Sequence, residues 1–416
     1  MTKQQGEADS RYAWIRLAAA LAIATVGGVG LWSGVVVLPT VQTEFGVARA
    51  DASLPYTLTL VGLCIGGLFM GRLADRFGVV VPVVIGAVAL AVGYCAAAAT
   101  TSLWQFALVQ GLLIGLLGAS AMFSPLLADI SLWFVRRRGL AVAIVAGGSY
   151  LAGAVWPPIV QHFVEAVGWR QTHVGIGLFC VAVILPLALV LRRRPPAFEL
   201  SPAGARAASG SPRPLGFSPG ALQGLLIVAG LTCCMAMSMP QVHIVAYCAD
   251  LGYGPARGAE MLSVMLGFGV VSRLASGWIC DHIGGLRTLA IGSALQMLAL
   301  ALFLPFDGLV SLYVISALFG LFQGGIVPAY AIIVREHFTP REAGTRIAAV
   351  ITATLFGMAL GGWMTGAIFD LTGSYKAAFA NGIWWNVVNL AIALWLVQRS
   401  GGGFLPRKPA SLARAG

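Results

Sequence analysis

The octapeptide GRLADRFG at residues 71–78 has a counterpart, GWICDHIG, at residues 277–284. Both copies have the form G-x-x-x-D-x-x-G, and Asp75 and Asp281 stand 206 residues apart. Each copy directly follows the second long apolar segment of its half of the chain. Parallel repeats of six membrane-spanning segments produce this kind of spacing. The repeat therefore predicts two equivalent halves.

The composition agrees with a chain built mainly of membrane-spanning helices. Of the 416 residues, 58% are hydrophobic and 10% are charged, and the mean hydropathy is +0.87. A soluble domain carries about a quarter charged residues, whereas twelve spans would take up about 240 residues here. The seven cysteines form no CxxC pair and lie in apolar stretches, so we interpret them as small hydrophobic residues. A soluble enzyme, a disordered chain and a secreted disulfide scaffold are excluded.

Charges, glycines and prolines divide the apolar sequence into twelve predicted spans. The spans lie at about 14–39, 52–74, 79–100, 102–128, 139–164, 170–191, 219–248, 258–280, 287–305, 308–335, 343–369 and 374–398. We therefore predict an all-α membrane protein with 12 transmembrane helices in two six-helix pseudo-symmetric bundles. Residues 1–191 form the first bundle, 192–218 a cytoplasmic linker rich in Pro, Ser, Ala and Arg, and 219–416 the second bundle and a tail.

The placement of basic residues predicts the orientation. Of the 26 Lys and Arg residues, 21 fall on the side of the N-terminus, and Arg273 lies inside a span. The other four are Arg49, Arg170, Arg257 and Lys376. The positive-inside rule then places both termini in the cytoplasm. Because the basic residues form no patch with interleaved aromatics, we expect no nucleic acid as a partner. The apolar spans make the lipid bilayer the expected partner.

Several motifs resemble those of a known family. GRLADRFG is similar to a loop motif of the major facilitator superfamily, and WFVRRRGLAVAIVAGGSYLAG at 133–153 resembles the fifth-helix signature of the monocarboxylate transporters. QVHIVAYCADLG at 241–252 and GGIVPAY at 324–330 are also similar. The chain is identified as a bacterial member of the monocarboxylate transporter or oxalate–formate antiporter branch. The resemblance implies the major facilitator fold and a multi-pass protein of the bacterial inner membrane.

Four charged residues at predicted helix ends are candidates for gating. Asp75 and Arg76 precede Gly78, which we expect to end the helix as a C-cap. A carboxylate at these junctions can latch the two halves through helix N-termini or arginines, or it can merely brace the loop. Asp281 repeats Asp75, and Asp129 is expected to pair with the basic cluster at 136–138.

Arg273 is the charge that we expect to lie deepest in a span. It stands about 12 Å along the helix from Asp281. A charge at this depth is costly and usually faces a wet cavity with a partner. Because a guanidinium stays protonated and can hold a carboxylate with two hydrogen bonds, the partner predicted is an anionic carboxylate substrate. The alternative is that Arg273 snorkels or bonds backbone carbonyls. The resemblance agrees with a substrate role, since the family's eighth helix carries an essential Arg at the matching place.

The sequence departs from the family at three positions. The oxalate-exchanging relatives also place a Lys in the eleventh helix. Here the only basic residue in the predicted span 343–369 is Arg346, which lies near one end of that span. One buried cation fits one carboxylate, so we favour monocarboxylates. The animal relatives have a Lys where Trp32 stands and an Asp where Gly269 stands, so proton coupling through those residues does not carry over.

Other residues at central depth are candidates for lining the substrate site. His243 can titrate near neutral pH and is the candidate for proton coupling, and Tyr247 lies one turn further on the same face. The remaining substrate-binding candidates are Trp32, Ser33, Ser120, Met122, Ser124, Gln323 and Tyr330. For each of them, interhelical packing or hydrogen bonding is the alternative.

These features predict a secondary active transporter for a small monocarboxylate anion of the lactate or pyruvate type. The expected mechanism is alternating access of two halves with a co-transported proton. A proton-independent carboxylate antiporter and a carrier of larger aromatic acids stay open as alternatives. No Walker motif, metal cluster or nucleophile elbow occurs in the spans, so we expect no enzyme activity, no cofactor and no metal. A monomer is expected.

Overall fold

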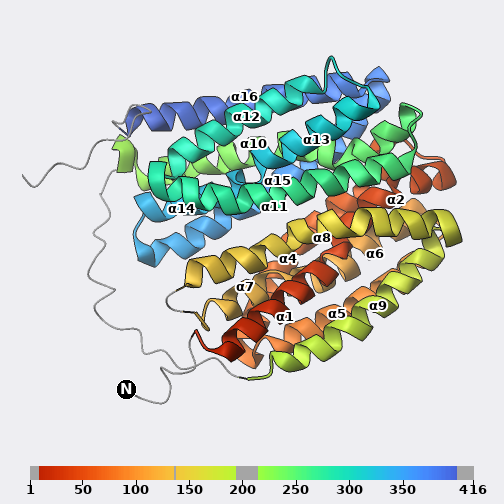
Figure 1. The fold of residues 1–416 in the computed structure, drawn as a ribbon, viewed down its shortest axis with the longest axis horizontal. Helices are drawn as coiled ribbons and strands as arrows, with labels where there is room; N and C mark the ends of the chain where they lie inside the picture. The colour runs from red at the N-terminus through yellow and green to blue at the C-terminus, as the bar shows by residue number, and fades with distance from the viewer. Residues whose placement is uncertain (1–8, 135–136, 194–213, 401–416) are drawn as a thin grey trace, which may run out of the picture.

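The computed structural model describes residues 9–134, 137–193 and 214–400. Most of the linker predicted at 192–218 falls outside these ranges, so its character stays a prediction. Within them the secondary structure is helical (Figure 1). The elements are α1 (Arg11–Gly27), α2 (Val29–Phe45), α3 (Arg49–Ala52), α4 (Leu54–Phe77), α5 (Val80–Ala98), α6 (Leu103–Val109), the π-helix η2 (Gln110–Gly118), the 3₁₀ helix η3 (Ala119–Met122), α7 (Ser124–Ile130), α8 (Arg138–Val167), α9 (Trp169–Val190), the 3₁₀ turn η5 (Pro214–Gly216), α10 (Pro219–Asp250), α11 (Pro255–Ile283), α12 (Gly285–Leu302), α13 (Leu309–Gln323), α14 (Ile326–His337), α15 (Pro340–Thr372) and α16 (Tyr375–Arg399).

The described residues contain 12 helical segments that are long and apolar enough to cross a membrane. The prediction of twelve membrane-spanning helices is thereby confirmed. Large apolar side chains lie on the outside of the molecule, including Trp104, Leu178 and Trp384, each more than 60% exposed. Such exposure is unfavourable in water and is the pattern expected of helices that face lipid.

Three of the predicted spans are interrupted instead of continuous. The first is divided at Gly28 between α1 and α2, and the tenth is divided at Gly324 and Gly325 between α13 and α14. The fourth passes through the π-helix and the 3₁₀ turn before α7. Pro125 follows this turn and lacks the N–H that would continue an α-helical ladder. Irregular backbone at membrane depth is tolerated where protein or a water-lined cavity surrounds it.

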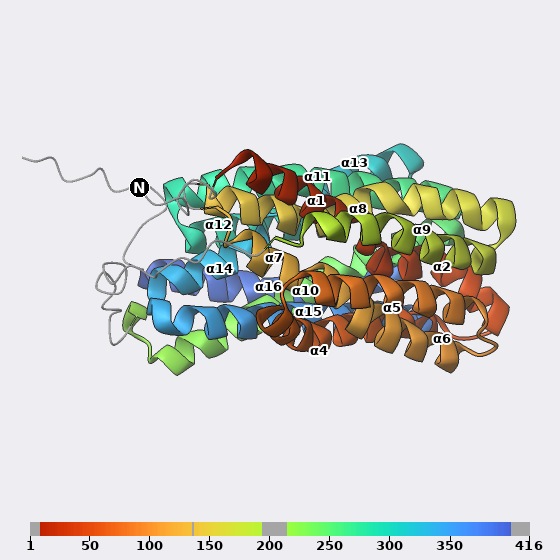
Figure 2. The same ribbon diagram turned by 90° about the horizontal axis from the view of Figure 1, so that it is seen from below.

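The helices form two bundles whose members run along the long axis of the molecule (Figure 1, Figure 2). We call α1–α9 the N-terminal bundle and α10–α16 the C-terminal bundle. Between the bundles, α8 packs on α11, α3 and α4 pack on α15, and α2 packs on α10. Figure 1 shows α8 and α11 close together on the right and further apart on the left. We call the end of the molecule at which α9 ends and α10 begins the linker end, and the opposite end, at which α3 lies, the Arg49 end.

The two octapeptides end their helices in the same way. Gly78 closes α4 and Gly284 closes α11, with φ angles of 84° and 83°. Their backbone N–H groups donate to Ala74 and Cys280, each at 2.8 Å. A positive φ favours glycine because it has no Cβ. The C-cap predicted at Gly78 is present, and the second copy of the repeat has the same geometry.

Candidate functional site

Arg273 lies near the middle of α11 and is partly buried between the two bundles. Its Nη1 donates to the carbonyl of Ala146 on α8 at 3.1 Å, and its Nε donates to the carbonyl of Gly324 at 3.3 Å. The guanidinium carbon lies 4.2 Å from the ring centre of Tyr150, also on α8. Among the described residues, no carboxylate is within ion-pair distance of Arg273. In this conformation the guanidinium is held by backbone carbonyls and an aromatic face.

The Gly324 carbonyl is available to Arg273 because of a proline. In an unbroken helix this carbonyl would accept from the N–H of residue 328, but residue 328 is Pro. The break between α13 and α14 therefore presents an unused acceptor in the membrane interior, and Arg273 takes it. Sequence reasoning identified GGIVPAY as a family-like segment but not this consequence of its proline.

Trp32 lies beside this site on α2. Its indole Nε1 donates to the carbonyl of Ser149 at 3.0 Å, three residues along α8 from Ala146. A Cβ on Gly153 would stand 2.7 Å from the Trp32 ring and 2.2 Å from Leu266. Glycine at 153 therefore permits the close packing of α2, α8 and α11. Trp32 and Arg273 thus hold carbonyls one turn apart on the same helix.

The remaining N-terminal candidates lie within their own bundle. Ser33 Oγ is 2.7 Å from the hydroxyl of Tyr94, and Ser120 Oγ donates to the carbonyl of Leu116 at 2.5 Å. Met122 fills space that Cβ atoms on Gly27 or Gly86 would occupy. Ser124 packs against Gly67 on α4. These contacts use the side chains for packing between helices, and none reaches the C-terminal bundle.

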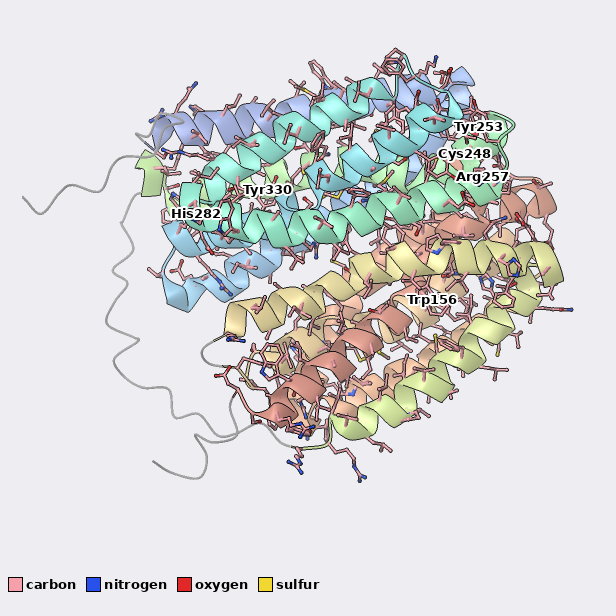
Figure 3. The ribbon with its side chains drawn as sticks, in the orientation of Figure 1. Trp156, Cys248, Tyr253, Arg257, His282 and Tyr330 are labelled. Atoms are coloured by element: carbon pink, nitrogen blue, oxygen red, sulfur yellow. The ribbon has the colours of Figure 1, made fainter. Side chains whose placement is uncertain are left out.

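Two candidates in the tenth span are fully buried. Tyr330 donates to Asn389 Oδ1 at 2.9 Å. Figure 3 shows Tyr330 among the helices of the C-terminal bundle. Gln323, the last residue of α13, accepts a hydrogen bond from Gln241 Nε2 at 3.0 Å. Gln323 Nε2 and Gln241 Oε1 have no hydrogen-bond partner. Gln241 was not among the residues selected from the sequence.

His243 lies towards the Arg49 end of α10. Its Nε2 is 2.8 Å from the carbonyl of Gly362 on α15, and its Nδ1 is 3.4 Å from the hydroxyl of Tyr375. Tyr247, one turn on, packs edge-on against the rings of Tyr375 and Phe379, and its buried hydroxyl has no partner. The two candidates therefore share the aromatic ring of Tyr375 as a neighbour.

Arg49 is a residue whose role the sequence did not indicate. It is 7% exposed, and its guanidinium reaches from α3 into the C-terminal bundle. Nη1 donates to Tyr375 at 2.5 Å and lies 3.1 Å from Asp250 Oδ2, while Nη2 donates to Asp250 Oδ1 at 3.1 Å. The ring centre of Phe369 lies 4.8 Å from its guanidinium carbon. In the sequence Arg49 counted only as one of four basic residues on the sparsely charged side.

The backbone next to Arg49 is also bound to the C-terminal bundle. Asp370 accepts from the N–H groups of Arg49 and Ala50, each at 2.8 Å. Further along α4, Thr57 donates to the carbonyl of Ala359 at 3.1 Å. We call Arg49, Asp250, Asp370 and Tyr375 the Arg49 cluster. It fastens the two bundles together at the Arg49 end.

The gating candidates at the linker end have no comparable contacts. Asp75, Arg76 and Asp281 are exposed, and among the described residues none of them forms an ion pair. Arg76 lies over the ring of its neighbour Phe77 instead. The interactions between the bundles are therefore concentrated between the Arg49 end and the level of Arg273.

Asp129 is bound differently from the prediction. Both of its oxygens accept from Arg16 of α1, at 2.7 Å each, and both residues are at least nine-tenths buried. Its partner among the described residues is thus Arg16 and not Arg137 of the predicted cluster, while Arg136 and the side chain of Arg138 lie outside what the structure describes. The prediction failed because Arg16 is 113 residues away in the chain. The pair joins α1 to α7 within one bundle.

The sequence profile described as the Major Facilitator Superfamily matches residues 19–315. The chain belongs to this superfamily. The curated relatives and solved structures that resemble this chain carry the names of transporters and not of enzymes.

Curated relatives in the superfamily include monocarboxylate transporter 13 of Bos taurus, which is 29% identical over 324 residues, covering 74% of this chain and 71% of the relative. A protein named MFS-type transporter opdF from Penicillium oxalicum is 27% identical over 337 residues, covering 80% and 77%. Both relatives are eukaryotic, so the expected bacterial origin of this chain is not supported by them.

Solved structures of transporters share the fold. The nucleoside transporter NupG has a TM-score of 0.68 at 15% identity, with 92% of this chain and 99% of that chain covered. The peptide transporter POT in complex with alafosfalin has a TM-score of 0.70 at 12% identity, with 92% and 95% covered. At these identities the likeness concerns the fold alone.

Proposed function

We propose that this chain is a secondary active transporter for small monocarboxylate anions of the lactate or pyruvate type. The observation that carries the proposal is Arg273, a cation in the middle of a span that meets carbonyl dipoles and no described carboxylate. Carbonyls can hydrogen-bond a guanidinium but cannot neutralise its charge. A carboxylate anion supplies the missing charge, and its binding lowers the cost of a charge at this depth.

The position of Arg273 connects binding with movement. Arg273 belongs to the C-terminal bundle, as does its acceptor Gly324, and it also bonds Ala146 of the N-terminal bundle. An anion that takes over the hydrogen bond to Ala146 therefore changes how the bundles are held together. A ligand shifts a conformational equilibrium only through different contacts in the two states. We propose that the halves 1–191 and 219–416 move about this site in alternating access.

The relatives support the substrate class. Monocarboxylate transporter 13 appears from two mammals at 29% identity over roughly three quarters of this chain. The fungal relatives carry names that mention no substrate, so they neither favour nor exclude a carboxylate.

The orientation is part of the proposal. Because the basic residues that the structure describes concentrate at the linker end, we assign that end and both termini to the cytoplasm of a bacterial inner membrane. The Arg49 cluster then closes the outer side. Asp75 and Asp281, which form no ion pair with any residue that the structure describes, lie on the inner side. We propose an inward-facing conformation of a monomer, in which Asp75, Arg76 and Asp281 latch the bundles only when the inner side closes.

For the co-transported proton, we propose His243 as the binding residue. Its Nδ1 faces the Tyr375 hydroxyl, which accepts from Arg49. Tyr375 therefore donates towards His243 while the imidazole is neutral. A proton on Nδ1 would turn an acceptor into a donor and oppose this contact. Protonation would thereby weaken the outer closure and link the proton to the outward-facing state.

The test is uptake of labelled L-lactate into proteoliposomes with and without an inward proton gradient. Gradient-stimulated uptake by the wild type that is lost in Arg273→Gln supports the proposal. Arg257→Gln is the matched control, because Arg257 is an exposed arginine of the same helix that pairs with Glu260. Uptake that survives in Arg273→Gln would remove Arg273 as the anion site.

Two other outcomes distinguish the alternatives. Counterflow of oxalate and formate that needs no proton gradient would indicate a carboxylate antiporter. Transport of aromatic acids without transport of lactate would indicate a carrier of larger acids.

A further inference from the structure

An amide pair lies beside the proposed anion site and is incompletely hydrogen-bonded. Gln241 on α10 donates to Gln323 at the end of α13 at 3.0 Å. Both side chains are at most 1% exposed. Each amide can donate two hydrogen bonds and accept two, yet Gln241 Oε1 and Gln323 Nε2 have no partner. A buried polar group without a partner costs about 1–3 kcal/mol.

Two separate routes through neighbouring residues connect this pair with Arg273. Gln323 directly precedes Gly324, whose carbonyl accepts from Arg273. Gln241 lies one turn from Met237 on the same face of α10, and the Tyr150 hydroxyl is 4.0 Å from the sulfur of Met237. The ring of Tyr150 in turn covers the guanidinium of Arg273.

The pair offers one donor group and one acceptor group. If both amides were rotated by 180°, Gln323 would donate to Gln241, and one NH₂ and one C=O would still be left over. The chemical group that satisfies both is one that donates and accepts at the same point, and a hydroxyl does so. A keto oxygen only accepts, so it satisfies the NH₂ and leaves the C=O alone. A methylene satisfies neither.

We infer that Gln241 and Gln323 recognise the hydroxyl group of a 2-hydroxy acid whose carboxylate is bound by Arg273. This rests on the proposed function and narrows its substrate class from monocarboxylates to 2-hydroxy monocarboxylates. The hydroxyl donates to one glutamine carbonyl and accepts from the other glutamine amide. Sites that hydrogen-bond a hydroxyl discriminate strongly against analogues that lack it, because the site's own polar groups are then left unpaired.

The experiment compares three three-carbon acids as substrates of the full chain in proteoliposomes. L-Lactate carries a hydroxyl at the second carbon, pyruvate a keto group and propionate neither. We expect apparent affinities in the order lactate, pyruvate, propionate, with about a tenfold or larger difference between lactate and propionate. In the double variant Gln241→Leu/Gln323→Leu, the three acids are expected to bind equally, with propionate affinity at least as high as in the wild type.

Gln296→Leu is the matched control, since Gln296 is also a fully buried glutamine of the C-terminal bundle but bonds Cys233. It should keep the wild-type order of affinities. If the double variant does not fold, Gln323→Met alone is expected to reduce the lactate preference.

The failures are distinguishable. Wild type that transports all three acids with equal affinity overturns the inference and leaves the proposed function intact. A lactate preference that survives in the folded double variant also overturns the inference and leaves the proposed function intact, since Gln241 and Gln323 would then bind only an internal water. Wild type that transports none of the three acids overturns the proposed function itself.

Discussion

Asp370 of α15 accepts a hydrogen bond from the backbone N–H of Arg49 at 2.8 Å, across the boundary between the two bundles. The same carboxylate binds the N–H of Ala50, while the Arg49 side chain bonds Asp250 and Tyr375. Backbone and side chain of one residue are thus held by three elements of the opposite bundle. Each hydrogen bond to a charged group contributes about 1.5–3 kcal/mol, enough for the cluster to influence which conformation is populated.

Asp370→Asn should open the Arg49 end more often. Asparagine keeps the size but can offer only one oxygen and no charge to the two N–H groups. Spin labels at Thr43→Cys and Lys376→Cys, both exposed, in a Cys95→Ser background report the separation of the bundles there. We expect a larger fraction of long distances. Asp51→Asn, a nearby exposed aspartate, is the control, and identical distributions for both variants would contradict the prediction.

Tyr375→Phe should weaken proton coupling more than transport itself. The substitution keeps the ring that packs on Tyr247 and Phe379 but removes the hydroxyl between Arg49 and His243. We expect lactate counterflow near wild-type rates and a smaller stimulation by an inward proton gradient. Full stimulation in this variant would mean that the proton does not act through His243 and Tyr375.

Gly320→Ala should destabilise the C-terminal bundle. An added Cβ would stand 1.8 Å from the carbonyl oxygen of Met265, and backbone cannot move aside easily. Overpacking of this kind costs about 1–3 kcal/mol or more. We expect a lower melting temperature in detergent. Gly277→Ala on α11, where nothing lies within 4 Å of the added atom, should melt like the wild type.

Arg16→Met alone should lower the stability of the folded protein more than Arg16→Met combined with Asp129→Leu. Breaking a buried ion pair leaves one charge unpaired at a cost of about 3–5 kcal/mol, whereas replacing both partners with apolar residues is often tolerated. The melting temperatures of the wild type, the two single variants and the double variant together form a double-mutant cycle that measures this effect. A double variant less stable than either single variant would show that the charges are needed for more than their mutual contact.

Asp75→Asn should slow uptake without changing stability. Asp75 is exposed and forms no ion pair among the described residues, so its loss removes no contact of the conformation described here. If it latches the inner side in the other conformation, the rate of exchange falls while the melting temperature stays the same. Unchanged uptake rates would leave Asp75 as a loop residue only.

The sequence predicted the fold well because membrane helices are defined locally. Each span needs about 20 apolar residues, and its ends are marked by charges and by glycines such as Gly78 and Gly284. The breaks near Gly28 and Gly324 were not predicted. The sequence of an apolar segment is the same kind of pattern whether or not its helix is interrupted. Whether a backbone carbonyl freed by the interruption finds a hydrogen-bond donor depends on the neighbouring helices.

The sequence by itself determined the twelve spans, the twofold repeat and the isolation of Arg273 as a charge at mid-span, since all three follow from the order of residues along the chain. Only the tertiary structure decided which groups meet. It joined Arg16 to Asp129, Arg49 to Asp250 and Asp370, and Gln241 to Gln323. Partners on different helices are 82 to 321 residues apart in these contacts, and their pairing depends on how the bundles pack, which no local pattern encodes.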